Sequence, residues 1–203
     1  MVRVSFDPHS PGWAATFEGE ARRIEAALAD LGIEVHHVGS TSVRGLRAKP
    51  IIDIDLGVPD STDEAAYLSA LVGAGYEFVL REPEWFEHRL FKHLDPRVNL
   101  HVFSIGSPEI ERMIAFRDHL RVNEADRNLY ESTKLALGDR EWGTVQDYAD
   151  AKSEVVGEIL GRALASRARS ISRRGVTRSG WPRDVPSLGD GASPQSPGRL
   201  RRP

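Results

Sequence analysis

Residues 35–58 read VHHVGSTSVRGLRAKPIIDIDLGV, a Gly-Ser turn followed by an apolar run that two acids interrupt. Asp53 and Asp55 are two residues apart, so on a β-strand both carboxylates project from one face. The apolar residues of the run project from the other face, where they are expected to pack into a core: Ile52, Ile54 and Leu56. The stretch therefore predicts a strand with one acidic and one apolar face.

Two carboxylates this close repel each other unless a cation lies between them or one of them takes up a proton. Mg²⁺ is usually bound through one or two carboxylates together with substrate phosphates. The upstream turn supplies backbone amides and hydroxyl groups, which is chemistry suited to holding a phosphate: Gly39, Ser40, Thr41 and Ser42. We therefore expect a divalent cation, Mg²⁺ or Mn²⁺, at Asp53 and Asp55. The alternative is an exposed structural pair of acids satisfied by water or basic neighbours.

A Gly-Ser turn, a gap over residues 41–52 and an Asp-apolar-Asp strand resemble the signature of the nucleotidyltransferase superfamily that includes DNA polymerase beta. The longer string HVGSTSVRGLRAKPIIDI, at residues 37–54, resembles the GrpB family in particular. Residues 100–102 and 116–121 and the later Tyr-Lys pairs add to this resemblance, which covers roughly residues 5 to 165. It implies metal-dependent transfer of a nucleotidyl group from a nucleoside triphosphate to an unknown acceptor. The alternative is a catalytically inactive nucleotide- or metabolite-binding module on the same fold.

Catalysis of this kind needs a third carboxylate on a later strand, to position a second metal and activate the acceptor. The candidate strand reads VNLHVF at residues 98–103 and contains no acid. Asn99 and His101 share one face of it, so we expect His101 to stand in as a catalytic residue and as a metal ligand beside Asp53 and Asp55. Imidazole suits Mn²⁺ better than Mg²⁺ and can also act as a general base. The alternative is a histidine that is hydrogen-bonded across the sheet.

The resemblance also implies nucleotide contacts from the turn residues and from four cationic side chains: Lys49, Arg117, Lys134 and Lys152. Lys49 lies between the turn and the acidic strand, where it can meet a phosphate or pair with the acids. Each of the other three belongs to a pair spaced four residues apart, which shares one helix face: Arg117/Arg121, Tyr130/Lys134 and Tyr148/Lys152. The alternative is a solvated helix face with ordinary ion pairs.

The order of periodic segments predicts an α+β fold, because a run of strands is followed by a run of helices. Strands are expected at 33–38, 51–58, 76–80, 88–94 and 98–104, and a short helix at 42–46. We expect a nucleotidyltransferase-like mixed sheet flanked by helices over residues 1–106, a helical C-terminal part over 107–166 and a disordered basic tail over 167–203. The first helix is expected to begin at Ser10-Pro11 and to end at Gly32.

Composition narrows the class of protein further. The chain contains no cysteine, which excludes disulfides and thiolate sites, and it has no apolar run long enough to cross a bilayer. No signal-peptide core opens it, so we expect a cytoplasmic protein without a membrane partner. Residues 166–203 hold nine of the 27 basic residues but two of the 30 acidic ones, which leaves an acidic body. An acidic body disfavours nucleic acid as a partner. The segment GLRAK at 45–49 lacks the ending of a kinase phosphate loop.

Overall fold

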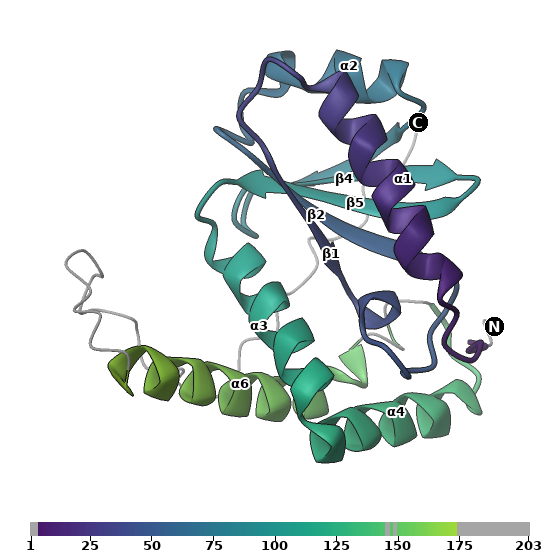
Figure 1. Cartoon of the computed structure of the whole chain (residues 1–203). Coiled ribbons are helices and arrows are strands. Elements are labelled where there is room, and N and C mark those ends of the chain that lie inside the picture. The colour runs from purple at the N-terminus through teal and green to yellow at the C-terminus, as the bar shows by residue number, and fades with distance from the viewer. Residues whose placement is uncertain (1–3, 145–146, 148–149, 174–203) are drawn as a thin grey trace.

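The computed structural model describes residues 4–144, 147 and 150–173. The chain runs through a first helix, a sheet interrupted by short helices, and a final group of three long helices (Figure 1). The strands are β1 (Glu34–Val38), β2 (Ile52–Val58), β3 (Glu77–Glu82), β4 (His88–Leu94) and β5 (Arg97–Ser104). The helices are α1 (Gly12–Ala27), α2 (Leu68–Gly73), α3 (Pro108–Val122), α4 (Glu124–Gly138) and α6 (Ser153–Arg173), with 3₁₀ turns η1 (Ser40–Ser42) and η2 (Glu64–Ala66). The predicted α+β fold is confirmed.

The five strands form one mixed sheet in the order β1-β2-β5-β4-β3. β2 and β5 are parallel neighbours at its centre, and the remaining neighbours are antiparallel. The parallel register pairs Asp53 with Asn99 and Asp55 with His101. The two acids and the two polar residues of β5 therefore share one face of the sheet, as the alternation predicts.

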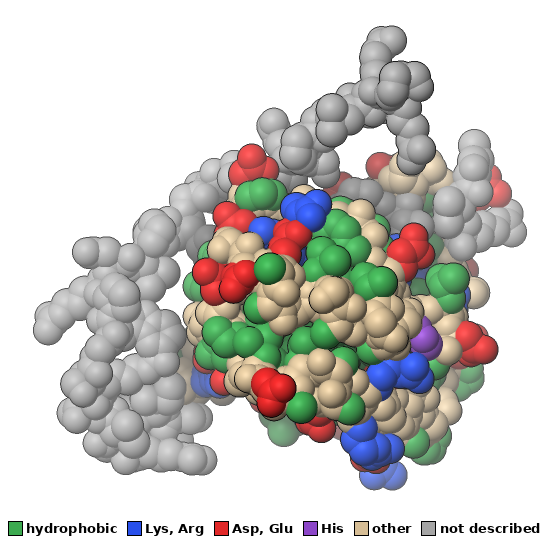
Figure 2. All heavy atoms as spheres, turned by 90° about the horizontal axis from the view of Figure 1, so that it is seen from above, with side chains coloured by type: hydrophobic (Ala, Val, Ile, Leu, Met, Phe, Trp, Pro, Cys, Tyr) green, Lys and Arg blue, Asp and Glu red, His purple; other side chains and the backbone are tan. Residues whose placement is uncertain are grey.

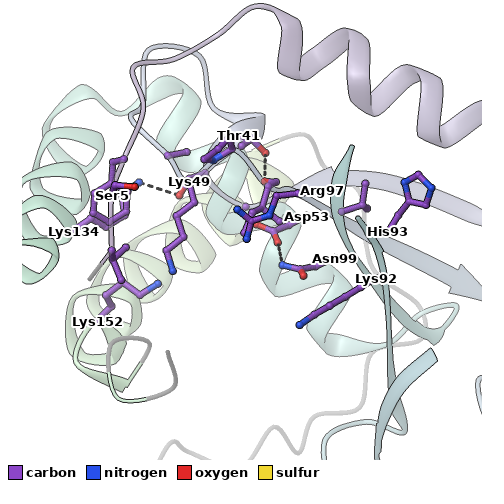
Figure 3. Close-up of a pocket in the computed structure, with 18 of the residues that line it drawn as sticks. Ser5, Thr41, Lys49, Asp53, Lys92, His93, Arg97, Asn99, Lys134 and Lys152 are labelled. Carbon is purple, nitrogen blue, oxygen red and sulfur yellow. Dashed lines mark hydrogen bonds between the residues drawn. The ribbon is translucent and has the colours of Figure 1, made fainter. Parts of the chain in front are cut away.

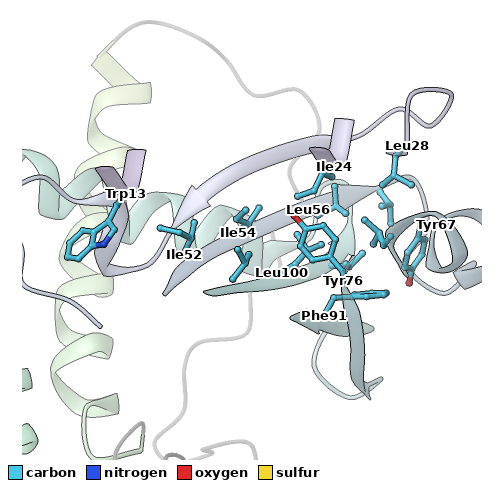
Figure 4. Close-up of a cluster of buried hydrophobic side chains, with 14 of the residues drawn as sticks. Trp13, Ile24, Leu28, Ile52, Ile54, Leu56, Tyr67, Tyr76, Phe91 and Leu100 are labelled. Carbon is cyan, nitrogen blue, oxygen red and sulfur yellow. The ribbon is translucent and has the colours of Figure 1, made fainter. Parts of the chain in front are cut away.

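The opposite face of the sheet carries the main core, which α1 and α2 cover (Figure 4). Ile54, Leu56 and Leu100 are completely buried there, and Ile24 of α1 packs against the same cluster. These are the alternate residues of β2 and β5, so one strand sequence supplies the core with one set of side chains and the polar face with the other. Burial of an aliphatic side chain of this size stabilises the fold by about 1.5–3 kcal/mol.

The three C-terminal helices pack on the loop between β1 and β2 rather than on the main core. A second cluster joins Val43 and Leu46 of that loop to one buried side chain from each helix: Leu120, Tyr130 and Ile159. Capping side chains fix where two of these helices begin. Ser107 accepts a hydrogen bond from the Glu109 amide at the start of α3, and Asn123 accepts one from the Asp126 amide at the start of α4.

Three expectations about helical segments differ from the structure, and the bounds of the strands other than β4 differ by one or two residues. The short helix expected at 42–46 is wrong: η1 ends at Ser42, Val43 is extended, and Gly45 has a φ of 84°, which a right-handed helix does not allow. α1 ends at Ala27 and not at Gly32, because Leu28 already leaves the helical region. α6 continues to Arg173, past the expected boundary at 166, and the rest of the expected tail lies outside the described residues.

The described part of the chain contains no helix that is both long enough and apolar enough to span a bilayer. Figure 2 views the protein from above Figure 1, over the α2 side. Among the residues coloured there, lysines and arginines lie in small separate groups between acidic and apolar side chains. This face therefore presents no continuous basic surface of the kind that a nucleic-acid duplex requires.

Candidate functional site

The Gly39 backbone lies directly against the Asp53 side chain. Gly39 has a φ of 68°, in the left-handed region that favours glycine. A Cβ atom at this position would overlap the Asp53 carboxylate and lie 2.9 Å from its Cβ. Glycine is therefore required at this position by the close approach of the turn to the acidic strand.

Hydrogen bonds within the turn fix its shape. Ser42 Oγ donates to the Gly39 carbonyl at 2.6 Å, and Thr41 Oγ1 donates to the Ile51 carbonyl at 3.3 Å. The Thr41 hydroxyl also lies 3.1 Å from His37 Nε2. Thr41 and Ser42 are both buried. Their hydroxyl groups thus serve the turn itself, and of the two only Thr41 lines the cavity described below.

Two arginines of α3 hold the turn from outside. Arg117 Nη1 donates to the His37 carbonyl at 3.0 Å, and Arg121 Nη2 donates to the Ser42 carbonyl at 2.9 Å. Arg117 was expected to contact a nucleotide, but it does not line the cavity. Its contact with the backbone just before Gly39 gives it a positioning role.

Asp53 is the acid that faces the cavity. Asn99 Nδ2 donates to Asp53 Oδ1 at 2.8 Å, across the parallel β2–β5 pair. Both side chains line the cavity (Figure 3). Asp53 is therefore oriented by a neutral partner, which leaves its charge available to a ligand.

Asp55 lies on the same face but is completely buried, with an exposed fraction of 0%. Neither of its carboxylate oxygens has a hydrogen-bond partner among the described residues. Burial, together with the charges of the neighbouring Asp53 and Glu109 carboxylates, raises the Asp55 pKa to about 8. Asp55 does not line the cavity, so the two predicted metal ligands occupy different environments.

His101 stands opposite Asp55 in the parallel pair and belongs to a chain of polar side chains. Its Nδ1 lies 3.0 Å from His88 Nε2, and His88 Nδ1 lies 2.8 Å from Glu82 Oε2. Burial lowers the pKa of both histidines, to about 3 for His88. The described residues include no group of three or more His, Cys, Asp or Glu side chains placed to hold a metal ion. Asp53, Asp55 and His101 therefore do not form a three-ligand metal site by themselves.

The cavity beside Asp53 has a volume of about 670 Å³, which lies in the usual range for small-molecule sites. Lys49, Lys134 and Lys152 lie together on one side of Asp53 in Figure 3. The turn contributes Gly39, Ser40 and Thr41 to the lining, whereas Ser42 and Arg117 are outside it. The fold therefore gathers three of the four predicted cations, from a loop, from α4 and from the segment before α6.

Lys134 is the most buried of these cations, with an exposed fraction of 2%. Its Nζ donates to Ser40 Oγ at 3.0 Å and to the Arg47 carbonyl at 2.6 Å, and it lies 4.8 Å from the centre of the Tyr130 ring. Burial lowers the Lys134 pKa to about 7, with a further contribution from the Lys152 charge. The interpretation of Lys134 as a solvated helix residue does not fit this burial.

The other two lysines show the same electrostatic pattern. Burial, followed by the Lys152 charge, lowers the pKa of Lys49, and burial lowers the pKa of Lys152. The Asp53 charge opposes both changes, because it raises each pKa. The Lys152 charge thus destabilises the charged forms of Lys49 and Lys134, and a bound anion would relieve this repulsion.

A model of the GrpB protein family matches residues 3–162. The chain belongs to the GrpB family. A UPF0157 protein of Halalkalibacterium halodurans is 53% identical over 158 residues, which cover 78% of this chain and 81% of that protein. A UPF0157 protein of Streptomyces coelicolor is 43% identical over 166 residues, which cover 82% of this chain and 87% of that protein.

The fold agrees with a solved member of the family. The crystal structure of the conserved protein GrpB from Enterococcus faecalis superposes with a TM-score of 0.71 and 28% identity, over 80% of this chain and 99% of that one. A dephospho-CoA kinase of Mycobacterium tuberculosis is also similar, at 28% identity over 71% of this chain but 42% of that protein. The family resemblance predicted from the turn and the acidic strand is therefore confirmed, and it is consistent with the nucleotidyltransferase superfamily.

Sequence reasoning missed Arg97 as part of this GrpB site. Arg97 lines the cavity. It precedes Asn99 by two residues in β5, so the two side chains share one face of the strand. The alternation that singled out Asn99 and His101 would have included Arg97 if the strand had been extended by one residue. Tyr130 also lines the cavity, and its spacing from Lys134 was the available signal.

The donor set fits a divalent cation in part. Asp55 has two buried oxygens without a partner, and Asp53 presents a carboxylate to the cavity on the same face. Two carboxylates completed by phosphate oxygens match the usual surroundings of Mg²⁺. When bound, Mg²⁺ or Mn²⁺ would draw charge from a triphosphate and keep Asp55 ionised.

Proposed function

We propose that this GrpB protein transfers a nucleotidyl group from a nucleoside triphosphate to a hydroxyl group of an acceptor. The observation that carries the proposal is the grouping of Lys49, Lys134 and Lys152 with the Gly39 turn and Asp53 around one cavity. A buried lysine and two half-buried ones, with the Lys152 charge lowering the pKa of the other two, favour a ligand with several negative charges. A triphosphate is such a ligand.

The residues divide the work of binding and orientation between them. The Gly39 turn and the three lysines hold the phosphates, and Asp53 with Asp55 supplies the carboxylates for Mg²⁺ or Mn²⁺. The acceptor oxygen forms a bond to the α-phosphorus while the bond from that phosphorus to the bridging oxygen breaks. Pyrophosphate leaves with the electron pair of the broken bond, and the hydroxyl proton passes to water. Preorganised cations stabilise the charge that the phosphates develop.

His101 keeps its predicted part in this proposal as the group beside the two acids. It lies on the required face and opposite Asp55, and its Nδ1 is engaged with His88. When Nδ1 carries the proton, Nε2 keeps a lone pair for a metal or a proton. His101 can therefore donate a hydrogen bond to His88 through Nδ1 and bind a metal through Nε2 at the same time.

The second candidate function is a nucleotide-binding module without catalysis. It is favoured by β5, where the residue next to Asp53 is the neutral Asn99 and not an acid. Under this alternative the cavity binds the triphosphate, but no acceptor displaces pyrophosphate. Fold similarity does not choose between the two, since one fold can host several functions.

The test measures transfer of label from each α-labelled nucleoside triphosphate into acceptors of a cell extract, with Mg²⁺ or Mn²⁺. We expect Asp53→Asn to reduce transfer by about 100-fold or more, on the scale of removing one group that stabilises the transition state. The matched control is Asp60→Asn, which makes the same chemical change in a turn after β2, outside the cavity.

Binding of each triphosphate is measured in parallel on the same proteins. Transfer that survives Asp53→Asn would overturn the catalytic assignment. Triphosphate binding without pyrophosphate release from any acceptor would favour the binding module. Absence of triphosphate binding would overturn both candidates.

A further inference from the structure

Two cations on the β4–β5 hairpin lie in the cavity but outside the lysine group. Lys92 of β4 is paired with Asn99 of β5, which in turn is paired with Asp53 of β2. Arg97 precedes Asn99 by two residues and so projects from the same face. Figure 3 shows Lys92 and Asn99 on the side of Asp53 away from Lys134 and Lys152.

Both side chains are exposed, and within the described part of the chain neither forms an ion pair with an aspartate or glutamate, although Glu77 of β3 is the register partner of Lys92. Their charges are felt by other groups of the site: Arg97 lowers the pKa of Lys49, and Lys92 lowers that of His101. A second anion on this side would be stabilised by these two charges.

We propose that Lys92 and Arg97 bind an anionic group of the acceptor, a carboxylate or a phosphate ester, while its hydroxyl group lies near Asp53. This inference rests on the proposed function. It assigns the acceptor to the class of small anionic alcohols, and it assigns Lys92 and Arg97 to acceptor specificity.

Strand spacing limits the size of that acceptor. Neighbouring strands are about 4.8 Å apart, so Lys92 and Asp53, which are two strands apart, have backbones about 10 Å from each other. Arg97 lies about 7 Å along β5 from Asn99. Because the Lys92 and Arg97 side chains extend into this space, a molecule of a few carbon atoms can reach from an anion at the hairpin to a hydroxyl at Asp53.

The test measures binding to the full chain by calorimetry, both alone and in the presence of a non-hydrolysable α,β-methylene triphosphate. Three compounds separate the chemistries: glycerol 3-phosphate, glycerate and neutral glycerol. We expect at least one of the two anions to bind. Glycerol should bind about tenfold or more weakly, because it lacks the charge-assisted hydrogen bond that the anionic group makes. The preferred anion identifies the phosphate or the carboxylate class.

Lys92→Ala and Arg97→Ala are each expected to weaken binding of that anion by about tenfold, and to weaken triphosphate binding by a smaller factor. The control is Arg22→Ala, an exposed arginine of α1 that does not line the cavity. The inference is overturned if glycerol binds with the same affinity as the two anions. It is also overturned if Lys92→Ala and Arg97→Ala weaken triphosphate binding as much as they weaken binding of the anion. Anion binding in the absence of any triphosphate binding would uphold the hairpin site and reject the proposed function.

Discussion

The two faces of β2 have opposite physical characters although they share seven residues of backbone. One face presents completely buried aliphatic side chains to α1 and α2, as Ile54 and Leu56 show. The other presents Asp53 and Asp55 to the site. Residues that stabilise the core and residues that line the site therefore alternate along a single strand, so substitutions one residue apart should affect different properties of the protein.

The polar face is itself divided between its two acids. Asp53 has a hydrogen-bond donor and an open cavity, whereas Asp55 has neither. A buried carboxylate without a partner costs stability whenever it is ionised. The protein is therefore less stable than it would be with an apolar side chain at position 55, a cost that is common at functional sites.

The largest expected effect concerns the apolar face. Ile54→Ala removes a completely buried side chain and leaves a cavity, so the free energy of unfolding should fall by about 2–5 kcal/mol. Urea denaturation monitored by circular dichroism measures it.

The paired variant is Asp53→Asn, one residue away on the polar face. We expect it to change the free energy of unfolding by less than about 1 kcal/mol, since an amide can still accept the Asn99 hydrogen bond. Equal losses in the two variants would contradict the division of β2 into a stabilising and a functional face.

The next prediction concerns the contact between the turn at Gly39 and Asp53 on the polar face of β2. Gly39→Ala and Gly45→Ala both place a side chain at positive φ, which costs about 1–3 kcal/mol. The new Cβ at position 39 overlaps Asp53, whereas the one at position 45 has no neighbour within 4 Å. We expect both variants to lose stability, and Gly39→Ala alone to lose triphosphate affinity, by about tenfold or more.

Thermal denaturation and triphosphate titration on the same samples separate these effects. The Gly45→Ala variant controls for backbone strain. A Gly45→Ala variant that loses affinity to the same extent would show that strain, and not the approach to Asp53, governs the site.

The smallest effect per step of the measurement, at most about 1.4 kcal/mol per pH unit, is a pH dependence with opposite signs on the two faces. The Asp55 pKa is raised to about 8, so the folded state binds more protons than the unfolded state between about pH 4 and pH 8. Its contribution to stability is therefore lost as pH rises. His37 stacks on Phe17 of α1, and burial lowers its pKa to about 4. Its contribution is lost as pH falls from about 6.5 to about 4.

Urea denaturation with a chelator present, at intervals from pH 4.5 to pH 8, measures both slopes. Asp55→Asn should gain stability relative to the wild type as pH rises, and His37→Gln should gain as pH falls. Each slope is at most about 1.4 kcal/mol per pH unit for one group. Slopes of the same sign for the two variants would mean that one of the two groups does not titrate as its burial indicates.

The sequence predicted the sheet well because alternation is a local property. The bounds of β4 match the expected 88–94. Asp53, Asp55 and His101 share one face, as predicted from the alternation of side chains along each strand. The GrpB membership followed from the string at 37–54, which keeps the turn and the acidic strand together.

What the sequence did not indicate depends on contacts between distant segments. The burial of Asp55 requires knowledge of what covers the sheet, and the role of Arg117 requires its contact with the His37 carbonyl. The loop at 42–46 has apolar residues at helical spacing, but Gly45 takes a positive φ and Leu46 turns into the second cluster instead. Arg97 was overlooked because the last strand was expected to begin at Val98, whereas β5 begins at Arg97.

The tethers between the helical part and the turn have a consequence for how the molecule assembles. Arg117, Arg121 and Lys134 all bond to carbonyl or hydroxyl groups between residues 37 and 47. The sheet can form its apolar core from the first half of the chain, but the turn at Gly39 is held by contacts from α3 and α4. We therefore expect this turn to reach its final shape in a newly made chain only after the C-terminal helices have docked.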